Sequence, residues 1–166
     1  MIELMQGDLL QAEAEAYVNT VNWVGVMGKG IALQFKQVYP NNYKLYRRIC
    51  QSKELHPGMM LVYDAGFTFD QCPRYIINFP TKDHWKGKSK LEWIEAGLSA
   101  LVQEVVTRRI ASIAVPALGC HNGGLDWADV RPRIETAFEP LENVRVLLYS
   151  PQNDSLLIVP EDLRFV

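Results

Sequence analysis

Two glycine-bearing segments have the residue types and spacing to bind a phosphate group. The first runs from Asn19 to Ala32 and places Gly25, Gly28 and Gly30 within six residues, between a predicted strand and a predicted helix. Glycines allow tight bends that aim backbone N–H groups at an anion, and the N-terminus of the helix adds partial positive charge. The segment matches neither GxGxxG nor the GxxxxGK phosphate-loop pattern, so a plain glycine-rich turn is the alternative.

The second segment, Pro116 to Trp127, also leads from an apolar run into a helical pattern. It carries three glycines, Gly119, Gly123 and Gly124. Loops at the carboxyl ends of strands can face one another across an open α/β sheet, which is where such sheets bind ligands. Two anion-binding loops arise by chance less often than one, so the pair predicts a ligand that carries a diphosphate.

Further candidate side chains lie at other strand ends. Lys82 follows a predicted strand, and a lysine beside a ligand can attack a carbonyl carbon or stabilise a developing charge. A solvated loop lysine is the alternative. Asp8 follows the first apolar run and can accept a hydrogen bond from an exocyclic amine or cap the next turn. Trp23 and Trp85 can stack on bases or simply pack against the protein.

Alternating strands and helices must position these segments. Apolar runs predict strands at 2–5, 16–19, 59–63, 75–79, 112–115 and 144–149, and periodic apolar positions predict helices at 27–38, 41–50, 90–108 and 127–138. The continuous apolar strands late in the chain indicate a sheet covered on both faces, so we expect an α/β sandwich with a largely parallel or mixed sheet. Residues 151–166 are expected to form a tail, with a short strand at 156–159 as the alternative.

Composition limits the function classes. The 166 residues carry 17 Lys and Arg against 19 Asp and Glu, a net charge of −2, which argues against coating nucleic acid by bulk charge. The length fits one domain, no apolar run could span a membrane, and the N-terminus is no signal peptide. The three cysteines and three histidines lack metal-ligand spacing. We therefore expect a cytoplasmic protein without a metal.

Taken together, these residues resemble a macrodomain, the ADP-ribose-binding α/β/α module, over about residues 1–150. The resemblance rests on Gly7-Asp8-Leu9, the two glycine loops and a strand ending in Tyr149. It implies a three-layer α/β/α sandwich with a central mixed, roughly six-stranded sheet. Residues 151–166 would be a C-terminal tail or the start of a truncated further region.

Two stretches, Val26 to Phe35 and Asn78 to Trp85, resemble more narrowly the macrodomain of the DarG antitoxin type. That family removes ADP-ribose that a DarT-type toxin attaches to thymine bases of DNA. The position of Lys82 is shared with the related terminal ADP-ribose protein glycohydrolase, which releases ADP-ribose from glutamate. The resemblance therefore implies a DNA ADP-ribosyl glycohydrolase.

The resemblance also implies which residues form the site. Lys82 and Asn22 would act at the distal ribose as the catalytic pair, and no cofactor is implied besides ADP-ribose as ligand and product. The other ADP-ribose contacts would be Asp8, Leu9 and Tyr149 at the adenine, and Asn19, Thr20, Gly28, Lys29, Gly30, Ile31, Thr81, Leu118, Gly119, Cys120, His121, Asn122, Gly123 and Gly124 around the phosphates and distal ribose. DNA contacts would come from His84, Trp85 and Lys86.

One departure bears on the substrate. The glutamate-directed relative has an aspartate inside the second glycine loop, whereas Asp126 lies beyond the glycines here and is expected to cap the following helix. This favours DNA as the substrate. We expect ADP-ribosylated single-stranded DNA and a DarT-type toxin as partners, and we expect a monomer. A non-catalytic ADP-ribose reader and a glutamate-directed protein de-ADP-ribosylase are the alternatives.

The net charge still permits contact with DNA. Lys82, Lys86, Lys88 and Lys90 fall within nine residues beside the expected site, and a solvated loop is the alternative. A local basic cluster predicts DNA binding that is weak and sensitive to salt, with ADP-ribose binding that is not.

Overall fold

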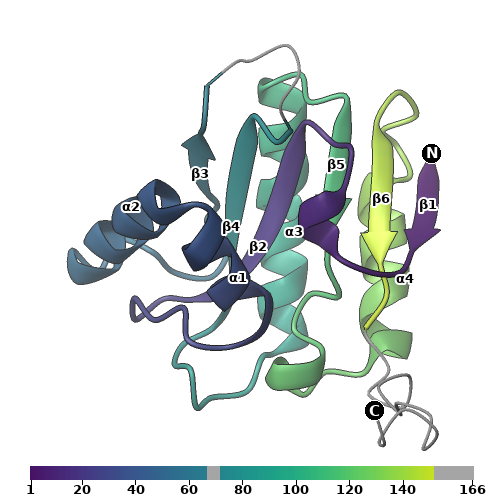
Figure 1. The fold of residues 1–166 in the computed structure, drawn as a ribbon. Coiled ribbons are helices and arrows are strands. Elements are labelled where there is room, and N and C mark those ends of the chain that lie inside the picture. The colour runs from purple at the N-terminus through teal and green to yellow at the C-terminus, as the bar shows by residue number, and fades with distance from the viewer. Residues whose placement is uncertain (67–71, 152–166) are drawn as a thin grey trace, which may run out of the picture.

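The computed structural model describes residues 1–66 and 72–151. Within them one six-stranded sheet has the order β1-β6-β5-β2-β4-β3 (Figure 1). The strands are β1 (Ile2–Met5), β2 (Ala16–Asn22), β3 (Leu61–Asp64), β4 (Tyr75–Lys82), β5 (Ser112–Val115) and β6 (Arg145–Tyr149). β3 pairs antiparallel with β4 and the other neighbouring strands pair in parallel, which confirms the expected mixed sheet.

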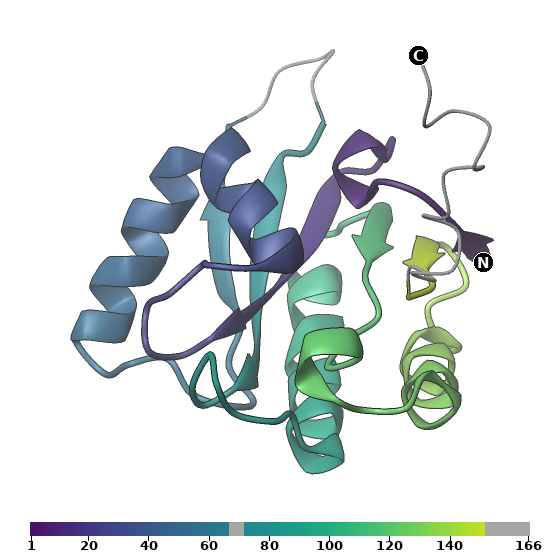
Figure 2. The ribbon, with the colours of Figure 1, turned by 60° about the horizontal axis from the view of Figure 1, so that its bottom comes forward.

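Helices cover both faces of this sheet, as the views from two directions show (Figures 1 and 2). The helices are α1 (Gly30–Val38), α2 (Pro40–Gln51), α3 (Leu91–Thr107) and α4 (Trp127–Phe138). Phe35 of α1 packs in one cluster with Tyr17 and Ile76 of the sheet. Side chains of α3 and α4 pack with the neighbouring residues Val18 and Ile77, which point to the opposite face. The expected three-layer sandwich is therefore confirmed.

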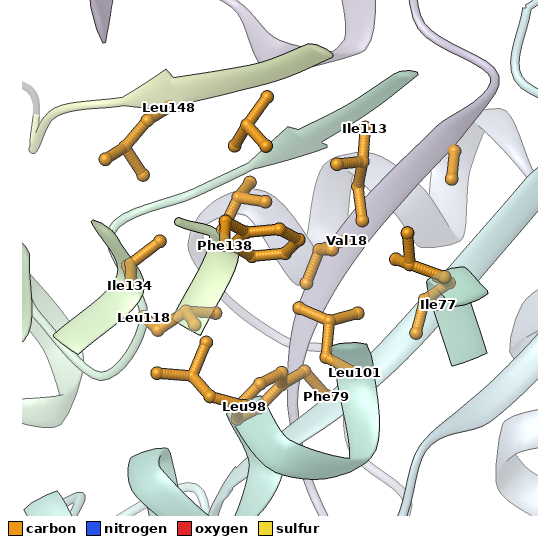
Figure 3. Close-up of a cluster of buried hydrophobic side chains, with 14 of the residues drawn as sticks. Val18, Ile77, Phe79, Leu98, Leu101, Ile113, Leu118, Ile134, Phe138 and Leu148 are labelled. Atoms are coloured by element: carbon orange, nitrogen blue, oxygen red, sulfur yellow. The ribbon is translucent and has the colours of Figure 1, made fainter. Parts of the chain in front are cut away.

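The core beneath α3 and α4 fixes the course of β4, whose last residue is Lys82. In this core, Val18, Ile77 and Ile113 of the sheet face Leu98 and Leu101 of α3 (Figure 3). Phe79 of β4 packs directly on the backbone of α3, because a Cβ atom on Gly97 would lie 2.2 Å from its Cζ. This close approach packs β4 tightly against the helix.

Two strands run further than their apolar patterns predict. β2 continues to Asn22 and β4 to Lys82, because the two strands pair in parallel from Ala16 and Tyr75 to these last residues. The paired extension carries polar side chains to the sheet's carboxyl edge. Ladder hydrogen bonds, rather than apolar side chains, set these strand ends.

The first helix begins later than expected, at Gly30 rather than Met27. Lys29 is extended and Gly30 has a φ of +57°, so the chain bends sharply just before the helix. Met27 is buried under the sheet face instead of starting a helical turn. The predicted strand at 59–63 is shifted to Leu61–Asp64, and the alternative strand at 156–159 lies outside the described residues.

Three features of the described part concern membrane-spanning helices, disulfide bonds and metal-binding groups. No helix there is long and apolar enough to cross a membrane. The three cysteines are free thiols. No three side chains of His, Cys, Asp or Glu gather there as a metal-binding group.

Candidate functional site

A cavity of about 690 Å³ opens at the carboxyl edge of the parallel strands, a volume suited to a nucleotide-sized ligand. Segments that follow β1, β2, β4, β5 and β6 line it. Of the residues expected at the site, the cavity is lined by Asp8, Leu9, Thr20, Asn22, Gly28, Lys29, Gly30, Ile31, Thr81, Lys82, Trp85, Lys86, Gly119, Cys120, His121, Asn122, Gly123 and Tyr149. The topology thus brings together loops that are far apart in the sequence.

Four expected residues do not line the cavity. Asn19 is fully buried and its Nδ2 donates to Oδ1 of Asn78 at 3.2 Å, inside the protein. Leu118 is fully buried in the core under α3 and α4. Gly124 lies in the second glycine loop and His84 in the loop after β4, but neither residue lines the cavity. Asn19 and Leu118 are core residues because their side chains turn inward from the edge.

Asp8 and Tyr149 meet at one end of the cavity. β1 and β6 pair with Met5 opposite Tyr149, so the residues after β1 lie beside the end of β6. Burial and then the charge of Asp8 raise the pKa of Tyr149. Asp8 also caps the short helix Leu9–Gln11, with Oδ1 accepting from the Leu10 N–H at 3.0 Å. The capping role is confirmed, and the carboxylate still lines the cavity where an exocyclic amine can donate to it.

The two glycine loops come into contact across the cavity. A Cβ atom on Gly30, at the N-terminus of α1, would lie 3.2 Å from Nδ2 of Asn122 in the second loop. The positive φ of Gly30 and the extended Lys29 expose the backbone N–H groups at the start of α1. Unpaired N–H groups at a helix N-terminus attract anions. The geometry therefore suits a phosphate held between the loops.

The loop after β4 supports the second glycine loop from the other side. The Ser89 N–H donates to the carbonyl of Gly123 at 2.9 Å. A Cβ atom on Gly123 would lie 2.4 Å from Oγ of Ser89, so no larger residue fits there without displacement. This Oγ is buried and makes no hydrogen bond within the described residues. The two loops are consequently one packed unit.

His121 is a non-glycine residue in a left-handed conformation, with a φ of +57°. It begins the short helix His121–Gly123 and lines the cavity. Backbone strain at a cavity wall is common at ligand sites.

Lys82 is the last residue of β4, and its amine points toward the loop that follows this strand. Its Nζ lies 3.4 Å from the carbonyl of Trp85, to which it can donate. Burial lowers the pKa of Lys82, and the nearby charges of Lys29 and Lys88 lower it further. Three lysines from two loops and a strand end thus share one part of the cavity. This arrangement favours a neutral, nucleophilic amine more than a free surface lysine would.

Asn22 lines the cavity, and most of its carboxamide is engaged in hydrogen bonds within the protein. Its Nδ2 donates to the carbonyl of Val26 at 2.8 Å, and its Oδ1 accepts from the N–H groups of Val24 and Val26 at 3.2 and 3.3 Å. Oδ1 also accepts from the hydroxyl of Tyr46 at 2.7 Å. These contacts engage Oδ1 and one N–H of Nδ2, so the carboxamide shapes the loop that follows β2. The second N–H of Nδ2 makes no hydrogen bond among the described residues, and the role of Asn22 at the distal ribose stays a prediction.

The rim of the cavity carries an aromatic and basic platform formed by His84, Trp85 and Lys86. Trp85 is 45% exposed and lines the cavity. The ring of His84 lies 4.9 Å from that of Trp85, and Nζ of Lys86 lies 4.8 Å from the centre of the indole. Such a platform can stack a base that enters with a ligand.

The cavity is also lined by residues that were not predicted individually as ADP-ribose or DNA contacts, although Lys88 belongs to the basic cluster and Gly7 to the motif Gly7-Asp8-Leu9. The further lining residues are Gly7, Val21, Val26, Ala32, Gln34, Gly87, Lys88, Pro116, Ala117, Ser150 and Pro151. Tyr46 lies behind the site and is buried on the inner face of α2. Tyr46 falls within the helix predicted at 41–50, and nothing in that pattern indicated a hydrogen bond to Asn22.

Comparison with known proteins places this geometry in a family. The family model described as the Macro domain matches residues 18–134. A curated relative from Thermus aquaticus, named DNA ADP-ribosyl glycohydrolase, is 50% identical over 151 residues, covering 91% of this chain and 41% of the relative. A protein of the same name from Mycobacterium tuberculosis is 51% identical, covering 95% of this chain and 44% of the relative. The chain therefore spans less than half the length of these two curated relatives.

Solved structures agree. The macrodomain of Mycobacterium tuberculosis DarG has a TM-score of 0.89 at 52% identity, covering 92% of this chain and 99% of that one. Thermosipho africanus DarTG in complex with ADP-ribose has a TM-score of 0.83 at 34% identity, covering 93% of this chain and 43% of that one. The sheet, the helices and the cavity-forming loops thus follow a known architecture.

Proposed function

Because the chain belongs to the macrodomain family, we propose that it is a glycohydrolase that removes ADP-ribose from thymine bases of single-stranded DNA. The names of its relatives support this proposal, since proteins about half identical to it are called DNA ADP-ribosyl glycohydrolases. The expected boundary at residue 150 and the monomeric state stay predictions.

One observation carries the catalytic part of the proposal: the amine of Lys82 with its lowered pKa, in the cavity between two glycine loops. Backbone N–H groups alone suffice to bind a diphosphate. A reader of ADP-ribose has no need of a partly desolvated lysine close to two other cationic side chains. The arrangement therefore favours an enzyme over a binding module.

ADP-ribose would lie along the cavity with its adenine near Asp8 and Tyr149. Its diphosphate would contact the start of α1 and the loop around Asn122. This leaves the distal ribose at the end of the cavity where Lys82 stands. The binding loops thus align the bond to be broken with the lysine, and orientation of this kind lowers the barrier.

Two roles of Lys82 fit this position. As a nucleophile, the neutral amine attacks C1″, thymine leaves with the bonding electron pair and gains a proton, and water then releases ADP-ribose from the lysine. As a cation, the ammonium stabilises the charge that develops on the departing base or the opened sugar. Neither role requires a cofactor.

The position of Asp126 supports DNA rather than protein glutamate as the source of the adduct. Its Oδ1 accepts from the Ala128 N–H at 3.0 Å and caps α4, as expected from the sequence. The stretch His121 to Gly124 within the second glycine loop contains no carboxylate to assist turnover of a lysine adduct. The exposed Trp85 at the rim is suited to stacking on a base beside the modified thymine.

A relative supports the biological setting. A protein from Thermosipho africanus, 34% identical over 163 residues, is named as a fusion of a DNA ADP-ribosyl transferase and a DNA ADP-ribosyl glycohydrolase. We propose that the present protein reverses the product of such a transferase, the DarT-type toxin, and so acts as its antitoxin.

The test compares release of ADP-ribose from an ADP-ribosylated thymidine oligonucleotide and from an ADP-ribosylated glutamate peptide. The wild-type protein should act faster on the oligonucleotide. Lys82→Ala should bind ADP-ribose in calorimetry but release none, and Lys36→Ala, a lysine of α1 outside the cavity, should behave as wild type. Unchanged turnover in Lys82→Ala, or preference for the peptide, would overturn the proposal.

Lys82→Arg separates the two roles. Arginine remains protonated at all accessible pH values and keeps the positive charge without a nucleophilic amine. Partial activity in this variant supports charge stabilisation. Complete loss, together with trapping of a wild-type lysine adduct by borohydride, supports covalent attack.

A further inference from the structure

Positive charge is concentrated in one part of a chain whose net charge is −2. No acidic residue occurs between Glu15 and Glu54. The basic residues in that interval are Lys29, Lys36, Lys44, Arg47, Arg48 and Lys53. The segment includes the first glycine loop, α1 and α2, so about one quarter of the chain is basic while the remainder is acidic on balance.

Helix α2 presents its basic residues on one face. Asn42, Tyr46 and Cys50 are its buried residues. Lys44, Arg47 and Arg48 are exposed, and their spacing of three and four residues places them side by side on the helix surface. A like-charge pair four residues apart, such as Lys44 and Arg48, destabilises a helix by a few tenths of a kcal/mol.

These three side chains have no ionic partner in the described part of the chain. The ion pairs there all use other cations, namely Arg74, Arg108, Arg131, Arg133 and Arg145. Those five arginines are neutralised locally, whereas the basic residues of α2 are not. Free, clustered cations on a rigid helix are available to an anionic partner.

This basic face is continuous with the cavity. A Cβ atom on Gly25 would lie 4.0 Å from Cγ of Arg47, so the loop after β2 packs against the side of α2. Val26 in the same loop lines the cavity. Figures 1 and 2 both show this loop passing between α2 and the loop that follows β4. One loop therefore separates the cavity from the basic face.

We propose that the exposed face of α2, formed by Lys44, Arg47 and Arg48, binds the sugar–phosphate backbone of the DNA strand that carries the adduct. This rests on the proposed function, because that function puts a DNA strand at the cavity mouth. The strand contacts Trp85 at the rim on one side of the modified nucleotide and crosses the loop after β2 toward α2 on the other.

The chemistry of the face fits a phosphate backbone. Sequence-independent binding of nucleic acid relies on Lys and Arg contacts to phosphates and requires no apolar centre. A stable protein partner requires a desolvated apolar or aromatic centre. The three adjacent residues of the α2 face are instead fully charged and exposed.

The test uses the variant Lys44→Gln/Arg48→Gln, which spares Arg47 because its side chain packs on the loop. The control is Arg131→Gln/Arg133→Gln on α4, which removes the same charge from the opposite layer. Binding of an unmodified single-stranded 20-mer is measured by fluorescence anisotropy over a range of salt. Release of ADP-ribose is measured on a modified 20-mer and on a modified single thymidine nucleotide.

The α2 variant should bind the 20-mer about tenfold more weakly near 0.15 M salt, with a salt slope shallower by about 1.4, since each phosphate contact contributes roughly 0.7. Its KM should rise on the 20-mer and stay at the wild-type value on the single nucleotide. Equal losses of affinity in the α2 and α4 variants would show that only net charge matters, which would overturn the proposal. Unchanged affinity in the α2 variant would overturn it as well.

Failure of the proposed function gives a different result. Wild-type protein would then release ADP-ribose from neither DNA substrate. Anisotropy with the unmodified strand still tests the α2 face in that case, because it needs no catalysis.

Discussion

The hydroxyl of Tyr46 lies 2.7 Å from Oδ1 and 2.9 Å from the carbonyl oxygen of Asn22, which ties α2 to the carboxyl end of β2. Burial raises the pKa of Tyr46, so the phenol remains a hydrogen-bond donor over the working pH range. Through Asn22 this contact also orders Val24 and Val26 in the loop at the cavity wall.

Removing this hydroxyl should loosen the loop. Tyr46→Phe leaves buried acceptors of Asn22 short of one donor, which costs about 1–3 kcal/mol in the free energy of unfolding. We expect a lower Tm and weaker binding of ADP-ribose in calorimetry. Tyr43→Phe is the matched control, since the Tyr43 hydroxyl makes no hydrogen bond among the described residues. Equal behaviour of the two variants would contradict the positioning role.

Ser89 and Gly123 should show strong coupling. Gly123→Ala forces its new Cβ against Oγ of Ser89, at 2.4 Å, and should displace the second glycine loop. Ser89→Ala alone removes a buried hydroxyl without a partner among the described residues, so its effect on stability should be small or favourable. The double variant should recover part of the ADP-ribose affinity lost in Gly123→Ala. Additive losses would show that the two loops are independent.

The pH dependence of release should report on Lys82. Burial, Lys29 and Lys88 lower its pKa, so its titration should begin below the usual lysine range. A nucleophilic amine makes kcat/KM rise with pH through this pKa, and a required ammonium makes it fall. In either case Lys88→Gln removes a repelling charge and raises the pKa of Lys82. The change of kcat/KM with pH should therefore occur at higher pH in this variant. Lys90→Gln, outside the cavity, should not move it.

Trp85 should contribute more to binding of a modified DNA strand than to binding of free ADP-ribose. Loss of one base stack costs about 1–3 kcal/mol, or roughly 5–150-fold in affinity. Trp85→Ala should raise KM on a modified oligonucleotide by an amount in this range, and Trp85→Phe should retain most of the affinity. Free ADP-ribose should bind either variant nearly as well as wild type. A parallel loss of ADP-ribose affinity would show that Trp85 contacts ADP-ribose itself rather than the flanking strand.

Some of the site follows from local sequence alone. The glycine spacing of both loops, the capping position of Asp126 and the alternation of strands with helices each depend on neighbours within a few residues. Parallel strands collect their carboxyl ends on one edge, so the pattern of strands and helices is enough to assign the segments around Lys82 and Gly123 to one site. The family resemblance supplied the substrate, which residue patterns alone do not.

The tertiary structure decided the roles of individual side chains. Asn22 lines the cavity, and its carboxamide also bonds to Val26 and to Tyr46, which lies 24 positions away on another element. Leu118 belongs to a glycine-bearing segment and yet lies in the core. The lowered pKa of Lys82 depends on burial in the cavity and then on the charge of Lys29, which lies near it because β2 and β4 are paired.

The sequence by itself determined the order of elements, the two glycine loops and the class of ligand, because these rest on periodicity, turn preference and local spacing. Only the tertiary structure decided which polar groups are already engaged within the protein and which remain free for a ligand. Hydrogen bonds, burial and charge coupling act between residues distant in the chain. The exposed basic face of α2 likewise lies beside the cavity because of a tertiary contact, the packing of Arg47 on Gly25.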